Sequence, residues 1–525
     1  MRLFKALLAV VAVGLVANPA RSDVSPHPIF SDNMVLQQGG TITVWGKAAP
    51  GENIQIGLER SAPGQASALG TSTTADKDGN WAIKLQKQTP GTGYKLTISG
   101  KNRVVFKNVA VGDVWVCSGQ SNMEWSVNAG ETPDKVKEGA KNPQLRLFTV
   151  QKRAAGTPIT DQGDLWHFDK WVESAPDTVG GFSAVAYHFG QKLQKELGVP
   201  VGLIHTSWGG TPCEAWTSLE ALQADPMLKH YANAAEAAAK QFESAKKTYE
   251  EALAKWKIEA SKAKADGKPI PKEPARPSPG PNSPSALYNA MIYPLLNFKV
   301  RGAIWYQGES NTTRAYEYRT LFPAMIEDWR KRFDCDLPFM LVQLAPYGNG
   351  NGNSAGVTYA ELRDAQLLAT KKLPKVGMAV ITDVGDEKDI HPKPKQPVGE
   401  RLALAALGIE YGKKIEFSGP AFKEAKYKGA TATLSFDHIT GGLVAKDGDL
   451  TGFTVLGEDD AFHPAKAEIK GDTIVVSSNE VKKVAGVRYG WTNFAKPTLN
   501  LFNGAGLPAS PFRTDDLPLT TQPKK

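Results

Sequence analysis

Ser121 stands where a short apolar strand breaks into a polar turn. The stretch VWVCSGQSNMEW, residues 114–125, is apolar as far as Cys117 and then changes to small polar residues. A serine in a strand-to-helix turn can expose its hydroxyl above a sheet, and the N–H beside it can stabilise an oxyanion. Because serine in a turn is more often structural, a catalytic role requires partners from elsewhere in the sequence.

Two further segments carry candidate oxyanion donors. Gly209 and Gly210 follow the predicted strand 201–206, and adjacent glycines allow the close backbone approach that aims an N–H at a bound group. The stretch IWYQGESN supplies two candidate amide donors and a carboxylate that could orient them or bind substrate: Gln307, Asn311 and Glu309. A tight turn and a helix-capping loop would explain the same residues without chemistry.

His391 is the candidate base. It lies in DVGDEKDIHP, directly after the last predicted strand, and Asp389 precedes it by two residues. A serine nucleophile needs a base, and the base needs an acid that orients it. Asp386 and Asp383 are alternative acids, and a Ser-His dyad without an acid is a further alternative.

A second histidine competes for this role. His463 fits the pattern Asp-x-x-His together with Asp460, whereas the position three residues before His391 is Lys388. His463 lies after the α/β pattern has ended. We favour His391, because ligand sites of parallel sheets lie at the carboxyl ends of the strands.

Alternating strands and helices between residues 113 and 413 must position these side chains. Apolar runs predict five strands, at 114–117, 201–206, 302–306, 339–344 and 377–382. Helical periodicity between them predicts four helices, at 182–197, 318–333, 359–372 and 397–410. This alternation is typical of an α/β domain with a parallel sheet.

Segments of a different character flank and interrupt this region. Residues 25–112 and 414–525 alternate apolar and polar residues between turn signals, which predicts a β module on each side. An insertion at about 219–284 begins as an Ala-, Glu- and Lys-rich exposed helix or helical hairpin and ends in a Pro-rich extended linker. A spacer is one interpretation of the insertion, and a lid or dimer contact is the alternative.

The composition, with 41% hydrophobic and 22% charged residues, is that of a globular protein, and 525 residues exceed one ordinary domain. The net charge of +8 forms no basic stripe or motif, so no nucleic-acid partner is expected. Three cysteines leave at least one free thiol, with one disulfide open as an alternative, and none has zinc-ligand spacing.

Residues 1–22 have the order of a secretory signal. A basic start with Arg2 and Lys5 precedes an apolar stretch, 6–17, and small residues that suit cleavage after Ala20 or Ser22. The apolar run is too short to span a bilayer. We therefore expect a removable signal, export to a periplasm or beyond it, and no membrane association afterwards; a buried N-terminal helix is the alternative.

Five spaced motifs, SGQSNMEW, SWGGTPCEAW, YNAMIYPL, IWYQGESN and DIHPKPK, resemble the sialate O-acetylesterase family of SGNH-type hydrolases. GWTNF and GLPASPFRTD near the C-terminus also resemble it. The resemblance implies a flavodoxin-like, three-layer α/β/α hydrolase domain that removes O-acetyl esters from carbohydrates. It implies no metal or organic cofactor.

The same resemblance implies roles for individual residues. Ser121 matches the nucleophile and His391 the base, with Asp389 the nearest acid, while the N–H groups of Ser121 and of Gly209 or Gly210 match the oxyanion hole. The third donor stays open, because the wider superfamily has Gly-x-Asn-Asp where this chain has Gly-Glu-Ser-Asn. The residues that we expect at the substrate are Gln120, Asn122, Trp208 and Glu309.

The expected partner is an O-acetylated carbohydrate, either sialic acid or a plant hemicellulose such as xylan or xyloglucan. An anionic sialate requires a cation near Ser121, for which Arg314 is one candidate. Four aromatic residues could stack on sugar rings or belong to the core: Trp125, Trp208, Trp216 and Tyr306. Non-catalytic sugar binding through the β modules is the competing function, and the sequence leaves the oligomeric state open.

Overall fold

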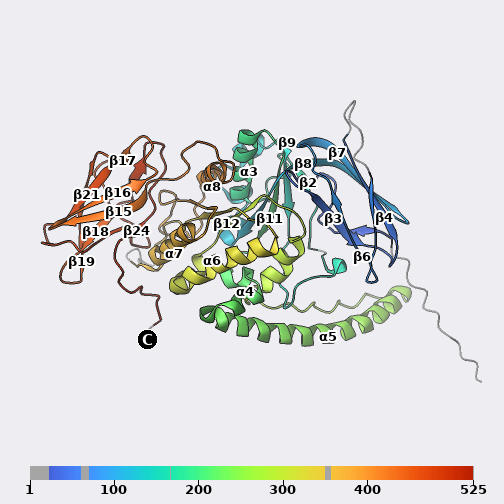
Figure 1. Ribbon diagram of the computed structural model, residues 1–525. Coiled ribbons are helices and arrows are strands. Elements are labelled where there is room, and N and C mark those ends of the chain that lie inside the picture. Colours follow the sequence, from blue (N-terminus) through green and yellow to red (C-terminus); the bar gives the residue numbers. More distant parts are fainter. Residues whose placement is uncertain (1–22, 61–69, 166, 349–355, 524–525) are drawn as a thin grey trace, which may run out of the picture.

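A computed structural model describes residues 23–60, 70–165, 167–348 and 356–523. The predicted signal lies outside the described residues. Figure 1 shows strands of the N-terminal region at one end, strands of the C-terminal region at the other, and mixed helices and strands between them. The chain is therefore a mixed α/β protein.

A seven-stranded path at the centre of the molecule carries the site. Its order is β10-β9-β11-β8-β12-β13-β14, and its strands are parallel apart from β10, which pairs antiparallel with β9 at the edge. The bounds are β8 Arg103–Gly119, β9 Asn142–Thr149, β10 Val172–Ser174, β11 Val201–Ser207, β12 Gly302–Tyr306, β13 Phe339–Val342 and β14 Val376–Ala379. The parallel sheet predicted from the sequence is confirmed.

Two of these strands, β9 and β10, were missing from the sequence prediction. The sequence of β9, NPQLRLFT, is interrupted by polar residues. Its Arg146 is 1% exposed, donates to Pro143 O at 2.6 Å and pairs with Glu173 of β10 at 3.1 Å. A buried, paired arginine obscured the apolar pattern, because burial of a charge is tolerated only with such partners.

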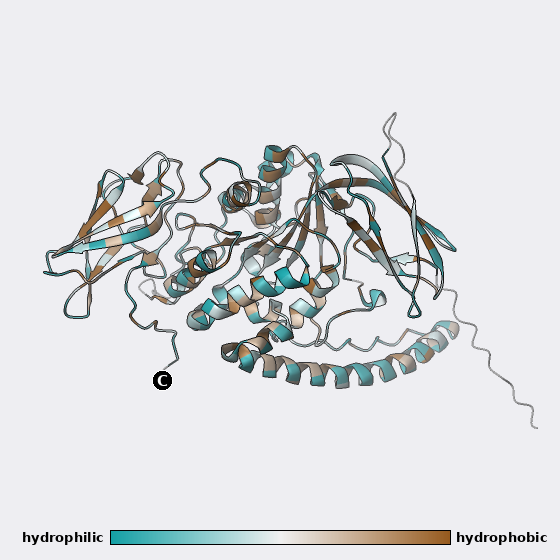
Figure 2. Cartoon of the chain, viewed as in Figure 1, coloured by the Kyte–Doolittle hydropathy of each residue, from teal (hydrophilic) through white to brown (hydrophobic). Residues whose placement is uncertain are grey.

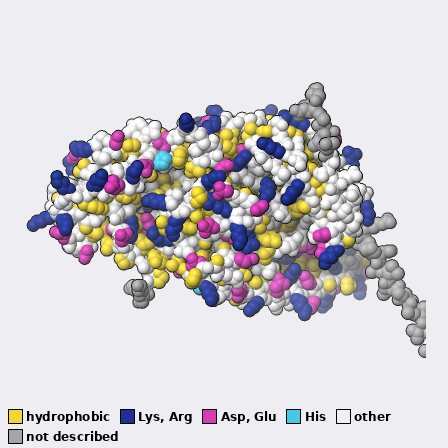
Figure 3. All heavy atoms as spheres, viewed as in Figure 1, with side chains coloured by type: hydrophobic (Ala, Val, Ile, Leu, Met, Phe, Trp, Pro, Cys, Tyr) yellow, Lys and Arg dark blue, Asp and Glu magenta, His cyan; other side chains and the backbone are white. Residues whose placement is uncertain are grey.

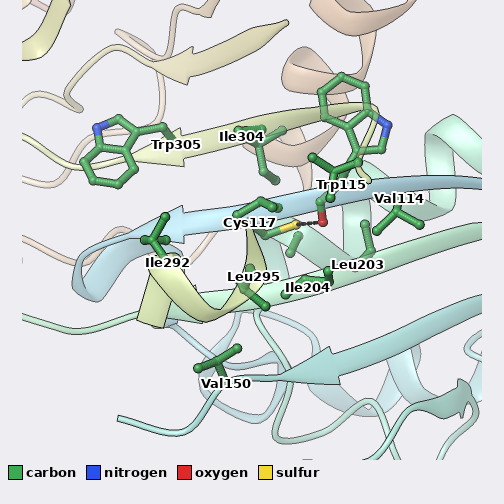
Figure 4. Packing of buried hydrophobic residues seen from close by; sticks show 14 of the residues in the cluster. Val114, Trp115, Cys117, Val150, Leu203, Ile204, Ile292, Leu295, Ile304 and Trp305 are labelled. Carbon is green, nitrogen blue, oxygen red and sulfur yellow. Dashed lines mark hydrogen bonds between the residues drawn. The ribbon is translucent and has the colours of Figure 1, made fainter. Parts of the chain in front are cut away.

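Apolar residues of the central strands form the core that supports the site. Residues 109–119 of β8 are all buried, since β11 and β12 pair with both edges of this strand. Figure 4 shows Trp115 and Cys117 of β8 beside Leu203 and Ile204 of β11 and Ile304 of β12. Such a strand reads as a continuous apolar run, which is why the sequence revealed it.

Four helices match the predicted ones to within three residues at either end: α3 Ala184–Leu197, α6 Ala315–Arg332, α7 Thr358–Lys372 and α8 Gln396–Ile409. Helix α3 packs on α8, and α6 packs on α7. Gly399 allows the first contact, because a Cβ there would lie 2.6 Å from Val185 O. Two short helices follow β8: α1 Ser121–Glu124 and α2 Pro133–Glu138.

Most of the insertion is one long helix that does not fold back as a hairpin. After α4, Leu219–Ala224, helix α5 runs from Lys229 to Ala265, and only Tyr231, Ala232 and Ala235 on it are buried. Figure 2 shows hydrophilic and hydrophobic residues alternating along α5, which runs along one side of the molecule. The Pro-rich segment returns beside the helix, with Trp256 Nε1 donating to Pro271 O at 2.8 Å.

The N-terminal strands share a hydrophobic core with the central sheet. Strand β8 pairs with β7 as far as Val111 and with β11 from Asp113, so the predicted boundary at residue 112 falls inside one continuous strand. The other strands are β1 Ser25–Pro26, β2 Val35–Gln37, β3 Ile42–Lys47, β4 Asn53–Arg60, β5 Thr71–Thr74, β6 Asn80–Leu85 and β7 Gly91–Ser99.

The C-terminal strands have a hydrophobic core of their own. They form two four-stranded sheets, β15-β16-β21-β20 and β19-β18-β22-β24, and the pair β17-β23. Their bounds are β15 Ala421–Lys428, β16 Thr431–Asp437, β17 Leu443–Ala445, β18 Phe453–Leu456, β19 Phe462–Pro464, β20 Lys466–Lys470, β21 Thr473–Ser477, β22 Gly486–Tyr489, β23 Leu501–Asn503 and β24 Phe512–Arg513.

All three cysteines are free thiols, with Cys117 and Cys213 buried. In the described part of the chain, no group of three His, Cys, Asp or Glu side chains is arranged to hold a metal ion. No helix there has both the length and the apolar character needed to cross a membrane. Figure 3 shows basic and acidic side chains intermixed on the visible face.

Candidate active site

Ser121 occupies the turn between β8 and α1. The turn is tight because Gly119, the last residue of β8, has a φ of 139°, and a Cβ there would lie 2.1 Å from Tyr306 O. Only glycine lets the chain turn this close to β12. Ser121 is left half-buried at the carboxyl end of the parallel strands, where such sheets bind ligands.

His391 meets Ser121 across the end of the sheet. Its Nε2 lies 2.8 Å from Ser121 Oγ, although 270 residues separate the two in sequence. The loop between β14 and α8 carries the histidine. Trp125 stacks on the imidazole with ring centroids 4.7 Å apart and an interplanar angle of 16°. The structure thus brings the predicted nucleophile and base within hydrogen-bond distance.

Asp389 is the aspartate that lies beside the imidazole. Its Oδ1 is 3.7 Å from His391 Nδ1 and accepts the backbone N–H of His391 at 2.8 Å. Asp386 accepts two backbone N–H groups of its own loop, and Asp383 binds Arg401 through both carboxylate oxygens. The two alternative acids are therefore used elsewhere.

His463 belongs to a separate cluster in the C-terminal strands. Its ring nitrogens bond to Asp459 and Glu480, each at 2.9 Å, at the molecular surface. These two carboxylates raise the pKa of His463. Asp460 of the Asp-x-x-His pattern adopts a φ of 58° in the turn before β19.

The Gly209 N–H, a predicted oxyanion donor, is bonded to a carboxylate. It donates to Glu124 Oε2 at 2.6 Å, while Glu124 Oε1 pairs with Lys152 at 2.6 Å. A Cβ on Gly209 would lie 3.2 Å from Ser121 Cβ, so this glycine directly adjoins the nucleophile. Gly210 follows with a φ of 74°. The Glu124 carboxylate must leave before a substrate can use the Gly209 donor.

The side-chain amides of Gln307 and Asn311 are hydrogen-bonded to other groups of the protein. Gln307 Nε2 donates to Asn311 Oδ1 at 2.7 Å and to Thr211 O at 3.3 Å, and Asn311 Nδ2 donates to Glu214 Oε2 at 3.0 Å. Both side chains are at most 1% exposed. Both amides are thus already bonded within the protein, and their role as oxyanion donors stays a prediction.

Gln120 and Asn122 are likewise buried, at 2% and 1% exposure. Gln120 Oε1 accepts the N–H groups of Gly308 and Ser310, each at 3.3 Å. Asn122 Nδ2 donates to Glu309 Oε1 at 2.6 Å. Gln120, Asn122 and Glu309, three of the predicted substrate contacts, are thus hydrogen-bonded to other groups of the protein. They support the turn that carries Ser121.

A cleft of about 1350 Å³ opens beside Ser121 and His391. Trp125 and Trp208 line it, whereas Trp216 and Tyr306 are fully buried and belong to the core. Among the described residues that line the cleft, the charged side chains other than histidine are Glu124, Lys152, Asp169 and Lys170. The open cleft, with aromatic side chains on its wall, has the character of a ligand site.

Arg314 does not serve this cleft as the sequence suggested. It pairs with Glu214 at 2.6 Å and lies over the Tyr231 ring at 5.4 Å. Lys152 lines the cleft, with its ammonium 5.8 Å from the Trp208 ring centroid. Its bond to Glu124 balances its charge.

Sequence reasoning overlooked three charged residues of the site. Glu124 follows Ser121 by one helical turn, a spacing that places both on one face of α1. Lys152 and Lys395 gave no comparable signal, because single lysines are usually solvated. Lys395, in contrast, is 2% exposed.

The charges around the site favour a neutral His391. Burial and then the Lys395 ammonium lower the pKa of His391, while Asp389 and Glu124 act in the opposite direction. Burial also lowers the pKa of Lys395 to about 7 and raises that of Glu309. An imidazole with a lowered pKa is unprotonated at neutral pH, as a general base must be.

Known proteins that resemble this chain include carbohydrate esterases. The family described as carbohydrate esterase, sialic acid-specific acetylesterase matches residues 111–265 and 278–408. The chain is 29% identical to sialate O-acetylesterase of Mus musculus, covering 92% of this chain and 93% of that protein. It is 31% identical to sialate O-acetylesterase of Homo sapiens, covering 74% and 72%. The crystal structure of a novel carbohydrate acetylesterase from Xanthomonas citri is similar, with a TM-score of 0.78, 33% identity, and coverage of 94% and 100%.

Proposed function

Because the chain belongs to the carbohydrate esterase family of sialic acid-specific acetylesterases, we propose that it removes O-acetyl groups from carbohydrates through an acetyl-Ser121 intermediate. It is a carboxylic ester hydrolase. The observation that carries the proposal is the 2.8 Å contact between Ser121 Oγ and His391 Nε2 on the wall of a large cleft.

The reaction divides into two acyl transfers. His391 Nε2 takes the Ser121 proton as Oγ attacks the acetyl carbonyl carbon, and the tetrahedral intermediate then collapses as the sugar oxygen leaves with that proton. Water attacks the acetyl-enzyme in the same way, with His391 as base, and releases acetate. Asp389 stabilises the imidazolium in both halves through its negative charge, 3.7 Å from Nδ1.

Backbone N–H groups of Ser121 and of Gly209 or Gly210 are the proposed oxyanion donors. Removing one such donor typically raises the barrier by about 3–4 kcal/mol. For the Gly209 N–H to act as a donor, the Glu124 carboxylate must move away from it. Lys152, which already pairs with Glu124, can hold the carboxylate elsewhere in the cleft. The substrate carbonyl oxygen would then replace the Glu124 oxygen at this N–H.

The proposed architecture around this chemistry is an SGNH-type, three-layer domain over residues 113–413 with a β-sandwich-like module on each side, 25–112 and 414–525. The parallel sheet and the helix pairs α3 with α8 and α6 with α7 support it. The order of charged, apolar and small residues over 1–22 supports export of the mature protein.

O-acetylated sialic acid is the proposed substrate, and acetylated hemicellulose is the alternative. The test measures acetate release by wild type and Ser121→Ala on acetylated sialic acid, acetylated xylan and acetylated xyloglucan. We expect wild type to release acetate and Ser121→Ala to release none, because no other group in this mechanism attacks the ester. Activity that survives in Ser121→Ala contradicts the mechanism, and sugar binding without acetate release favours a binding protein.

A further inference from the structure

A buried lysine lies behind the catalytic histidine. Lys395 follows His391 by four residues and is 2% exposed, and its Nζ donates to Asn122 Oδ1 at 2.5 Å. An ammonium group loses much hydration free energy on burial, so a buried lysine without a solvent-facing end is uncommon. The chain therefore needs a reason to keep this charge at the site.

The ammonium lies near two aromatic rings, one of which stacks on the base. Lys395 Nζ is 5.7 Å from the ring centroids of both Trp125 and Tyr306. Trp125 stacks on His391 through the same indole. Cation–π attraction draws a lysine and an indole together most strongly when both are shielded from water. Lys395 thereby stabilises the aromatic wall against which the imidazole rests.

The same ammonium fixes an amide that joins the nucleophile to the base. Asn122 directly follows Ser121, and its Nδ2 donates to Ile390 O, the residue before His391, at 3.0 Å. It also donates to Glu309 Oε1 at 2.6 Å. With Oδ1 bound by Lys395, the amide has both sides occupied and cannot flip. One side chain, Asn122, thus connects the segment of the Ser121 hydroxyl to the segment of the His391 imidazole.

Glu309 supplies the negative charge of this network. Its Oε2 is buried and has no hydrogen-bond partner among the described residues, although Oε1 is bonded to Asn122. Glu309 and Asp389 are the carboxylates whose charges act on Lys395, and both favour its ammonium form. The pair of Lys395 and Glu309 is therefore a coupled unit, joined through the amide between them.

We propose that Lys395 is a positioning residue of the esterase site, which holds Trp125 and Asn122 so that His391 faces Ser121, and which places a positive charge behind the base. This inference rests on the proposed function of the same site. It assigns Asn122 and Glu309 to the support of the catalytic pair.

The Lys395 charge shifts the pKa of His391 in a definite direction. Lys395 lowers the pKa of His391, whereas Asp389 and Glu124 raise it. Lys395, with a pKa of about 7, is charged in the acidic range where His391 titrates. Removing the ammonium therefore raises the pKa of His391, and the rise of kcat/KM with pH moves to higher pH.

The experiment compares pH profiles of kcat/KM for wild type, Lys395→Met and Lys395→Gln on one acetyl ester. Lys395→Met removes the charge and the donor, so we expect the acidic limb to move to higher pH and kcat to fall on the order of 100-fold, with KM changed far less. Lys395→Gln can keep a bond to Asn122, so it should shift the limb equally and lose less kcat. Lys393→Met removes an exposed lysine of the same loop and should match wild type.

Two outcomes overturn the inference while the proposed function stands. The first is a folded Lys395→Met or Lys395→Gln whose kcat/KM profile keeps its acidic limb at the wild-type pH. The second is a fall in kcat/KM that is caused by a higher KM alone, with kcat unchanged. Near-ultraviolet circular dichroism establishes that each variant is folded, and Lys395→Gln provides the test if Lys395→Met is not. Acetate release by wild type and its loss in Ser121→Ala, measured in the same series, show whether the proposed function holds.

Discussion

A serine hydroxyl is a weak nucleophile until a base takes its proton, and His391 is held where it can do so. Its Nε2 faces Ser121 Oγ at 2.8 Å, and Trp125 fixes the plane of its ring. The acid side of the pair is weaker, because Asp389 is 3.7 Å from Nδ1 and half-exposed. The imidazole is thus held by stacking on Trp125 as well as by its contact with Asp389.

This weak acid contact predicts the behaviour of Asp389→Asn. We expect kcat/KM to fall on the order of 10- to 100-fold, less than the roughly 10⁴-fold loss where the acid bonds the histidine directly. Because Asp389 raises the pKa of His391, its loss should move the acidic limb of the kcat/KM profile to lower pH, opposite to Lys395→Met.

The matched control is Asp386→Asn, which keeps a carbonyl acceptor for the two N–H groups of the loop. It should retain the wild-type rate and pH profile. An equal loss of activity in both aspartate variants would show that the loop, and not the Asp389 charge, is what matters.

At the scale of elements, the end of β8 decides where Ser121, the proposed nucleophile, lies. The strand lies between β11 and β12, and its last residue turns against β12 so closely that no side chain fits. The helix that follows starts with Ser121, and Glu124 and Trp125 lie at its end. One short segment thus supplies the proposed nucleophile, the carboxylate bonded to the Gly209 N–H, and the ring that stacks on His391.

Gly119→Ala tests this dependence on one turn. A Cβ 2.1 Å from Tyr306 O forces backbone movement, and we expect the free energy of unfolding to fall by roughly 2–4 kcal/mol. Activity should fall further than stability explains, since Ser121 shifts with the turn. Gly57→Ala on β4, where a Cβ meets no atom within 4 Å, is the control and should change neither. Denaturant unfolding and acetate release measure both effects, and wild-type activity in Gly119→Ala would refute the account.

At the scale of the whole molecule, a buried arginine ties the C-terminal strands to the central region. Arg363 of α7 donates to the carbonyls of Leu344 and Ala345, which follow β13, and to those of Thr492 and Asn493. Burial lowers its pKa to about 10, so it stays charged at neutral pH. The C-terminal strands have their own core, and this guanidinium is a main polar link to the rest.

Arg363→Leu should therefore loosen the C-terminal region. It removes a guanidinium whose N–H groups four carbonyls accept, two of them on the buried Leu344 and Ala345, and we expect the free energy of unfolding to fall by roughly 3–5 kcal/mol. Limited proteolysis should cut between residues 411 and 421 sooner than in wild type. Arg319→Leu, which breaks a partly exposed pair with Asp364, should cost less than about 1 kcal/mol and leave cleavage unchanged. Equal resistance of Arg363→Leu and wild type would count against the link.

The sequence alone indicated five of the parallel strands, the four main helices and the two residues proposed as the catalytic pair, because each has a local signal. Continuous apolar runs mark buried parallel strands, and helical periodicity marks amphipathic helices. Ser121 and His391 lie in polar turns directly after strands, which for parallel strands must meet at one edge. The family could likewise be inferred from five motifs, since these motifs are local in sequence.

Only the tertiary structure decided which polar residues face the cleft and which support it. Gln307, Asn311 and Asn122 have side chains suited to an oxyanion or a sugar, yet each is buried and bonded within the protein. Glu124 at the Gly209 N–H and Lys395 behind Trp125 are partnered across distant parts of the chain. The physical reason is that a polar side chain's role depends on its burial and its partners, and these are fixed by contacts between residues that the sequence does not place side by side.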